Sequence, residues 1–296
     1  MQDVTVEREK YIGGSDIPII MGISKFKTRF DLLLEKAQVK DNDFEGNEYT
    51  EYGNIMEEKI RNFVNQSGIY KKPFLEDKVI KDDLRYHSDG FNGSAVLEIK
   101  TTSQIYEKLE DYKVYLVQLL FGMQMHGVKK GLLAVYERPE DFNTEFDSKR
   151  LTTYAVDLDN FEDLLNEINL AVDKFREDLI KVKENPFITE EDLQPMELIE
   201  LSNKVVALET RLKEYKAIED ESKKVRAELK KAMESHRVKS WVTKNGVKIT
   251  LIEDGKDTEV KVFNEDKFKE DNPELYSNYL ETKIKKGRSG SLRITI

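Results

Sequence analysis

Residues 87–100 read HSDGFNGSAVLEIK, and this stretch decides the fold of the first half of the chain. Asn92-Gly93 is a strong signal for a two-residue β-hairpin loop. The segment 95–101 that follows alternates its side chains with the two-residue period of a strand. One face carries Val96, Glu98 and Lys100, and the other carries Leu97 and Ile99. We therefore expect a strand at 85–87, a turn at which Asp89 ends that strand, and a second strand at 95–101.

Strands and helices alternate on both sides of this hairpin. Further strands are predicted at 78–80, 131–136 and 151–157, and helices at 16–21, 29–37, 51–66, 107–126 and 161–183. Ser15 is the predicted N-cap of the first helix, and Thr28 with Asp31 resembles a capping box for the second. The alternation indicates a mixed α/β fold, with a central mixed sheet flanked by helices.

The last third of the chain has a different character. A long helix at about 195–236 begins with a heptad seam formed by Leu201, Val205, Leu208, Leu212 and Tyr215. Glu219 and Arg226 then fall on seam positions, which favours a helical hairpin with 161–183 over a long parallel coiled coil. A small β extension around Asn245-Gly246 follows. We expect two domains, 1–190 and 191–296.

The composition excludes several kinds of protein. Among the 296 residues there is no Cys, which excludes disulfides, thiolate zinc sites and a cysteine nucleophile, and which fits a reducing cytoplasm. The three His are far apart in sequence, so any metal would sit on carboxylates, which suits magnesium or manganese. We expect no membrane-spanning segment and no signal peptide.

The charge is unevenly distributed along the chain. Residues 191–296 carry 22 Lys/Arg and 21 Asp/Glu, a net charge of +1, and residues 1–190 carry 26 and 37, a net charge of −11. The chain ends with a basic tail that contains Lys283, Lys285, Lys286, Arg288 and Arg293. A net-acidic protein is a less frequent nucleic-acid binder, but net charge does not fix the sign of a cleft.

Asp89, Glu98 and Lys100 are the best candidates for chemistry. Glu98 and Lys100 leave one face of their strand, and the hairpin brings Asp89 alongside them. Two carboxylates and a lysine suit metal-assisted phosphodiester hydrolysis, in which the metal activates a water and neutralises phosphoryl charge. By spacing alone, a solvated face of an antiparallel sheet is the more frequent meaning of this pattern.

Three neighbouring features favour the catalytic interpretation. Glu57 shares an inward helical stripe with Gly53, Ile60 and Val64, whereas Glu58, Arg61 and Asn62 lie on the polar side. An inward carboxylate is costly unless it is paired or bound to metal. Tyr115 and Gln118 intrude on a packed helix face. Gly13-Gly14 precedes a helix N-terminus, where a phosphate can approach backbone N–H groups.

The ordered set of motifs resembles the YqaJ-type viral recombinase family, the lambda-exonuclease-like branch of the PD-(D/E)XK nucleases. The resemblance covers roughly residues 8–140 and rests on Arg8 with IGGSD (12–16), GISKFKT (22–28), GNIME (53–57), SDG (88–90), LEIK (97–100) and YLVQ (115–118). It implies a restriction-endonuclease-like core followed by the C-terminal helical hairpin and small β extension. Many relatives have proline after the helix glutamate, whereas here Glu58 follows Glu57, so either glutamate could be the ligand.

The resemblance also implies a role for each site residue. Mg²⁺ or Mn²⁺ would be held by Asp89, Glu98, the Ile99 carbonyl and Glu57. The catalytic lysine would be Lys100, and the site would be lined by Gln118 and Tyr115. Arg8 and Ser15 would bind a DNA phosphate, plausibly the terminal 5′-phosphate.

The implied function is a magnesium-dependent 5′→3′ exonuclease on double-stranded DNA ends, acting in phage-type recombination. Implied partners are a phage single-strand annealing protein and further copies of the chain, in a ring-shaped trimer or similar homo-oligomer. The place of action would be the cytoplasm of a bacterial host, and the origin a phage or prophage. Two alternatives stay open: a restriction-like or RecB-type endonuclease on the same core, and a catalytically inactive protein that binds a recombination partner.

Overall fold

The fold is taken from a computed structural model, which describes residues 7–41, 46–252, 259–281 and 287. The chain divides into two compact units, Met1–Leu193 and Gln194–Ile296. Among the described residues, no helix has both the length and the hydrophobicity that crossing a bilayer demands.

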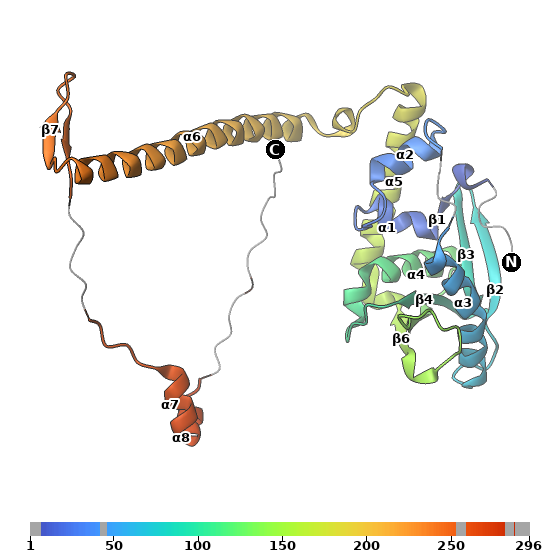
Figure 1. Cartoon of the computed structure of the whole chain (residues 1–296). Helices are drawn as coiled ribbons and strands as arrows, with labels where there is room; N and C mark the ends of the chain where they lie inside the picture. The colour runs from blue at the N-terminus through green and yellow to red at the C-terminus, as the bar shows by residue number, and fades with distance from the viewer. Residues whose placement is uncertain (1–6, 42–45, 253–258, 282–286, 288–296) are drawn as a thin grey trace. The chain divides into compact units, whose positions relative to one another are not determined.

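A six-stranded mixed sheet forms the centre of the first unit (Figure 1). Its strands are β1 Ile12–Gly13, β2 Leu75–Lys81, β3 Leu84–Phe91, β4 Ala95–Thr102, β5 Lys130–Glu137 and β6 Leu151–Asp157. They follow the order β1-β3-β4-β5-β6, and β2 pairs with β3. The β1–β3 and β4–β5 pairs are parallel and the others are antiparallel. The predicted central mixed sheet is confirmed.

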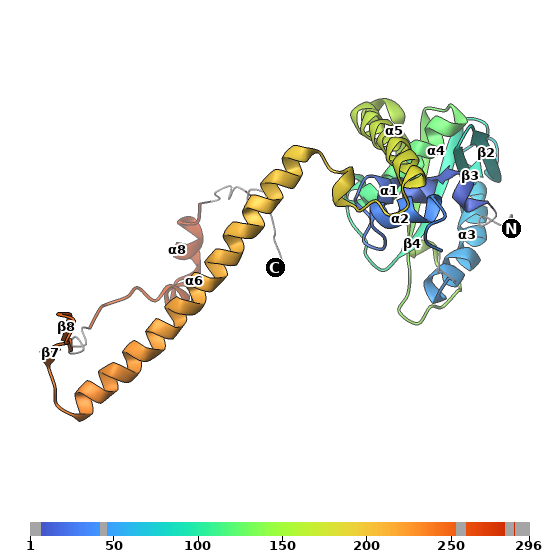
Figure 2. The same cartoon turned by 90° about the horizontal axis from the view of Figure 1, so that it is seen from above.

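Helices cover both faces of this sheet. They are α1 Ile17–Ile20, α2 Arg29–Lys36, α3 Glu48–Gln66, α4 Lys113–His126 and α5 Glu162–Glu184. Short 3-10 helices lie at Arg8–Lys10, Gly14–Asp16, Leu109–Tyr112, Ser148–Arg150, Leu158–Phe161 and Glu191–Leu193. α4 packs on β4 and β5 and also contacts α1 and α5. In the view from above, α3 and α5 lie on opposite sides of the unit (Figure 2).

Two apolar cores lie on the two faces of β4, because its side chains alternate. Val96 belongs to the core that contains Leu119, Leu120 and other residues of α4. Leu97 and Ile99 belong to the core formed with the α3 residues Tyr52, Met56, Ile60 and Val64. The predicted alternation is therefore correct, and it assigns Glu98 and Lys100 to the face that α4 covers.

Two predictions about the helices of this unit are wrong. Ser15 does not cap α1, because the helix begins at Ile17 and the Asp16 carboxylate accepts the Gly13 N–H at 2.9 Å. In α3 the buried stripe includes Met56 and leaves Glu57 half-buried at its edge, because the four-residue spacing starts at Tyr52 rather than Gly53. The Thr28 cap of α2 is confirmed, since its Oγ1 accepts the Asp31 N–H at 3.0 Å.

The second unit begins with one long helix. Its elements are α6 Met196–Ser235, β7 Ser240–Val242, β8 Lys248–Thr250, α7 Glu265–Asp271 and α8 Pro273–Asn278. The predicted hairpin of α6 with α5 stays a prediction, because α5 belongs to the first unit and α6 to the second. Within the second unit the seam of α6 is exposed, with Leu208 at 57% and Leu212 at 58%.

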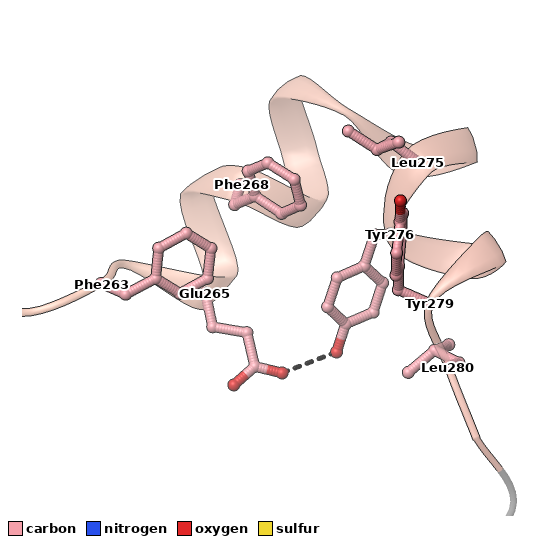
Figure 3. Close-up of a pocket in the computed structure, with 7 residues that line it drawn as sticks. All are labelled: Phe263, Glu265, Phe268, Leu275, Tyr276, Tyr279 and Leu280. Atoms are coloured by element: carbon pink, nitrogen blue, oxygen red, sulfur yellow. Dashed lines mark hydrogen bonds between the residues drawn. The ribbon is translucent and has the colours of Figure 1, made fainter.

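The helices α7 and α8 enclose a shallow apolar hollow (Figure 3). It is lined by Phe263, Glu265, Phe268, Leu275, Tyr276, Tyr279 and Leu280, and Tyr276 donates a hydrogen bond to Glu265 at 2.7 Å. The predicted basic-tail residues Lys283, Lys285, Lys286, Arg288 and Arg293 lie outside the described residues.

Candidate active site

A β-bulge in β3 places the first candidate residue. The pairing of β2 with β3 shifts between Asp77↔Ser88 and Leu75↔Phe91, so β3 carries an extra residue between these pairs. On the other edge, Gly90 pairs with Leu97, which sets Asp89 across from Glu98. Asp89 therefore lies within β3, not at its end as predicted. A bulge of this kind re-aims a side chain, and here it turns Asp89 to the face that Glu98 occupies.

The three predicted catalytic residues are brought together. The Lys100 Nζ atom lies 2.7 Å from Glu98 Oε1, and Glu98 is only 4% exposed. Asp89 Oδ2 accepts a hydrogen bond from the Ile99 N–H at 2.6 Å. The bond ties the Asp89 carboxylate to the backbone of β4 between Glu98 and Lys100. Two carboxylates and one ammonium group thus share a small, largely buried volume.

The electrostatics of this cluster are dominated by burial and by like charge. Burial and the neighbouring Glu98 carboxylate raise the pKa of Asp89 well above its ordinary value, and Glu57 adds to the effect. For Lys100, burial opposes the charged form, but the Glu98 and Asp89 carboxylates outweigh it and raise the pKa. The Lys100 ammonium group is therefore protonated, and in the absence of a cation Asp89 holds its proton more tightly than an exposed aspartate does.

Tyr86 is a site residue that the sequence does not indicate. It is 2% exposed, and its hydroxyl donates a hydrogen bond to Glu98 Oε2. Tyr86 and Asp89 are three apart, which on a regular strand would put them on opposite faces. They share a face because the bulge separates them. No local pattern of sequence signals that contact.

Glu57 and Arg61 approach the site from α3. The Arg61 guanidinium contacts Glu57 Oε1 at 2.9 Å and Glu76 Oε1 at 2.5 Å, and it donates to the Asp89 carbonyl at 2.5 Å. Arg61 is 9% exposed, so its predicted place on the polar side of the helix is wrong. The guanidinium is buried because three acceptors satisfy it. Burial raises the pKa of Glu57 despite this partner, and Glu58 is exposed.

The loop that carries Arg8 and Ser15 is organised by a buried ion pair. Lys36 Nζ lies 2.8 Å from Asp16 Oδ2 and donates to the carbonyls of Arg8 and Tyr11 at 2.7 and 2.5 Å. Arg8 Nη2 is 3.5 Å from Asp16 Oδ1, and Ser15 is exposed. Lys36 is the second residue that the sequence does not indicate, since it reaches this loop from α2.

Tyr115 and Gln118 lie on α4, the helix that packs on β4. Tyr115 acts electrostatically on Lys100, so it belongs to the surroundings of the cluster. Its ring stacks on Tyr112 with the ring centroids 6.0 Å apart. The Gln118 amide donates to the Val114 carbonyl of its own helix at 3.3 Å, so its described bond stays within α4. Tyr115 is therefore linked to the cluster of Asp89, Glu98 and Lys100, whereas the described hydrogen bond of Gln118 is not.

Residues 6–125 match the model of the YqaJ-like viral recombinase domain. This segment contains β1 to β4, most of α4 and every candidate residue described above. In residues 6–125 the chain is similar to the YqaJ-like viral recombinase domain.

Two bacterial proteins resemble the chain in sequence. The protein YqaJ of Bacillus subtilis is 32% identical over 126 residues, which cover 38% of this chain and 39% of that protein. The protein MG373 of Mycoplasma genitalium is 23% identical over 246 residues, which cover 62% of this chain and 86% of that protein. The 126 residues matched in YqaJ are close in number to those of the recombinase-domain match at residues 6–125.

Similar solved structures include two exonucleases. A phage-related exonuclease from Haemophilus somnus is 18% identical with a TM-score of 0.44, covering 58% of this chain and 95% of that one. An alkaline exonuclease from Laribacter hongkongensis is 15% identical with a TM-score of 0.43, covering 60% and 94%.

The donor set of the recombinase domain fits a hard cation. Among the described residues, no three His, Cys, Asp or Glu side chains converge to form a complete metal cage. Asp89, Glu98 and the Ile99 carbonyl offer two carboxylates and one backbone oxygen. Magnesium is often bound by one or two carboxylates together with waters and substrate phosphates, so an incomplete cage suits it. A cation would also oppose the effects of burial and of the Glu98 carboxylate, which raise the pKa of Asp89.

Proposed function

We propose that the first unit is a divalent-metal-dependent deoxyribonuclease, a 5′→3′ exonuclease that acts on double-stranded DNA ends in phage-type recombination. The observation that carries the proposal is the convergence of Asp89, Glu98 and Lys100 on one sheet face beside a β-bulge. The similarity of residues 6–125 to the recombinase family supports the same chemistry. The polarity and the recombination role rest on that similarity.

The proposed roles follow from the contacts. Asp89, Glu98 and the Ile99 carbonyl, with Glu57 nearby, would hold Mg²⁺ or Mn²⁺, which supplies an activated water and neutralises phosphoryl charge. Lys100 keeps its proton beside two carboxylates. With the metal bound, Lys100 would position the attacking water or help to deprotonate it.

The DNA contacts are assigned to the loop before α1 and to α4. Arg8 and Ser15 would bind the terminal 5′-phosphate, and Tyr115 and Gln118 would line the path of the strand. The proposed partners are duplex ends, a phage single-strand annealing protein and further copies of the chain, in the cytoplasm of a bacterial host.

The test uses linear duplex DNA with one labelled strand and with each 5′ end either phosphorylated or not. Wild type should remove the 5′-phosphorylated strand from its end with Mg²⁺ and not with chelator. Lys100→Ala should fold and bind metal but lose most turnover, and Glu98→Ala should lose metal binding as well. Lys149→Ala, at an exposed lysine outside the site, is the matched control and should act as wild type.

Other results would point to the alternative functions. Cleavage of covalently closed circular DNA would indicate an endonuclease on the same core. Absence of any degradation by folded wild type with Mg²⁺ or Mn²⁺ would refute the enzymatic function and leave a binding protein.

A further inference from the structure

Two glycines enclose the ring of Tyr86. A Cβ atom added at Gly122 would lie 2.2 Å from Tyr86 Cζ, and one added at Gly14 would lie 2.7 Å from Cδ2 and Cε2. Side chains do not pack at such distances, so both positions admit the ring only because they lack a Cβ. Gly122 belongs to α4, and Gly14 begins the 3-10 helix before α1. Two elements far apart in sequence thus fix one aromatic ring of β3.

The ring delivers its hydroxyl to one oxygen of Glu98. Tyr86 donates to Oε2, and Lys100 lies 2.7 Å from Oε1. Each carboxylate oxygen therefore has its own partner, one neutral and one charged. Because Glu98 is 4% exposed, these protein groups rather than bulk water set the orientation of the carboxylate. Lys100 is itself 26% exposed at its side chain and less constrained than the enclosed tyrosine.

We propose that Tyr86 is a positioning residue for the cation site, holding the Glu98 carboxylate in its ligating orientation. The inference rests on the proposed function, since it presumes that Glu98 binds a divalent cation. In this role Tyr86 acts through its hydrogen bond to Glu98. Gly14 and Gly122 contribute to this positioning, because the absence of a Cβ at each leaves room for the Tyr86 ring. The glycine motif before α1 then serves the metal site as well as the phosphate site.

The test is a calorimetric titration of the full-length protein with Mn²⁺ or Mg²⁺ in the absence of DNA, which measures the Kd for the cation. Tyr86→Phe keeps the ring and removes the hydroxyl. Partners that orient a metal ligand typically change affinity about 10- to 100-fold, so we expect Kd to rise by that factor. DNA cleavage by the variant should return toward the wild-type rate at saturating metal, which a general packing defect would not allow.

Tyr112→Phe is the matched control. Tyr112 is also 2% exposed, and its hydroxyl accepts the Tyr106 N–H at 2.7 Å, so the same atom is removed from a buried bond outside the carboxylate cluster. Its Kd for the cation should equal that of wild type. If Tyr86→Phe does not fold, Gly14→Ala replaces it, because the added Cβ displaces the ring and leaves the hydroxyl intact.

The outcomes separate this inference from the proposed function. A wild-type protein that binds cation, with an unchanged Kd in Tyr86→Phe, or in Gly14→Ala where that variant is used, overturns the positioning role and leaves the nuclease standing. A wild-type protein that binds no divalent cation overturns both. An equal rise of Kd in Tyr112→Phe also overturns the inference, because the effect would then follow from any lost buried hydroxyl.

Discussion

At the residue scale, Asp89 reduces the stability of the metal-free fold. Its pKa is raised by burial and by Glu98, so the folded state binds this proton more tightly than the unfolded chain does. The free energy of unfolding therefore falls as pH rises from the ordinary value of an aspartate through the raised one. We expect Asp89→Asn to increase the metal-free Tm at pH 7 and to flatten the decrease of Tm with pH.

The same variant should lose the stabilisation that metal provides. A ligand that binds only the folded state raises Tm, so Mn²⁺ should raise it for wild type and not for Asp89→Asn. Thermal melts with chelator and with Mn²⁺ measure both effects. Asp141→Asn, at an exposed carboxylate, is the control and should keep the metal response. A metal-free Tm that drops in Asp89→Asn would contradict the assigned repulsion.

Lys36 should determine the response to the 5′-phosphate. Lys36→Met removes the charge that holds Asp16 and the carbonyls of Arg8 and Tyr11. Breaking a buried pair from one side costs about 3–5 kcal/mol, so the variant is compared below its own Tm. We expect the ratio of degradation rates on 5′-phosphorylated and 5′-hydroxyl ends to approach one. A ratio that stays at the wild-type value would separate this loop from phosphate binding.

The sequence predicts the residues whose roles depend on local spacing. Glu98 and Lys100 are two apart on a regular strand, so their common face follows from the pleat alone. Tyr86, Arg61 and Lys36 could not be found in this way, because each reaches a group that lies 12 or more residues away in sequence: Glu98, the Asp89 carbonyl and the Tyr11 carbonyl. Asp89 lies across from Glu98 as the hairpin predicts, but the direction of its side chain depends on a bulge that no turn residue indicates.

At the scale of elements, α4 depends on close approach to the sheet. Gly122→Ala would place a Cβ 2.2 Å from the Tyr86 ring, and overpacking of this kind costs about 1–3 kcal/mol. Gly53→Ala in α3 is the matched control, since its Cβ would meet only Thr101 Oγ1 at 3.6 Å. An added Cβ there should stabilise the helix by about 0.5–1 kcal/mol. Chemical unfolding measures the free energy of unfolding of both variants, which should fall for Gly122→Ala and rise for Gly53→Ala. A decrease in both variants would contradict the packing argument.

The periodicity of the sequence predicted that β6 and α6 exist, but it did not predict which surface packs against α6. The bounds of β6 agree with the predicted 151–157, and α6 with the predicted 195–236 to within a residue. The partner of α6 could not be predicted from periodicity, because an amphipathic seam shows only that a helix has an apolar face. It carries no information about which surface covers that face.

At the scale of the whole molecule, charge is separated along the chain. Residues 1–190 carry a net charge of −11, while the tail after Glu281 contains Lys283, Lys285 and Lys286. Local positive charge attracts a duplex, and a basic tail is one source of it in a chain whose first 190 residues are net acidic. Each phosphate contact contributes about 0.9 to the slope of log K against log salt. Replacing the three tail lysines with alanine should therefore weaken DNA binding and flatten its salt dependence.

The control for this prediction removes the same charge from another place. Lys213, Lys216 and Lys224 are exposed on α6, so replacing them with alanine gives a protein of identical net charge. Fluorescence anisotropy on a labelled duplex at several salt concentrations, with metal chelated, measures the slope for both variants. A flatter slope in the tail variant alone assigns phosphate contacts to the tail. An equal change of slope in both variants would mean that net charge, rather than a tail contact, sets the affinity. An unchanged slope in the tail variant would exclude the tail from DNA binding.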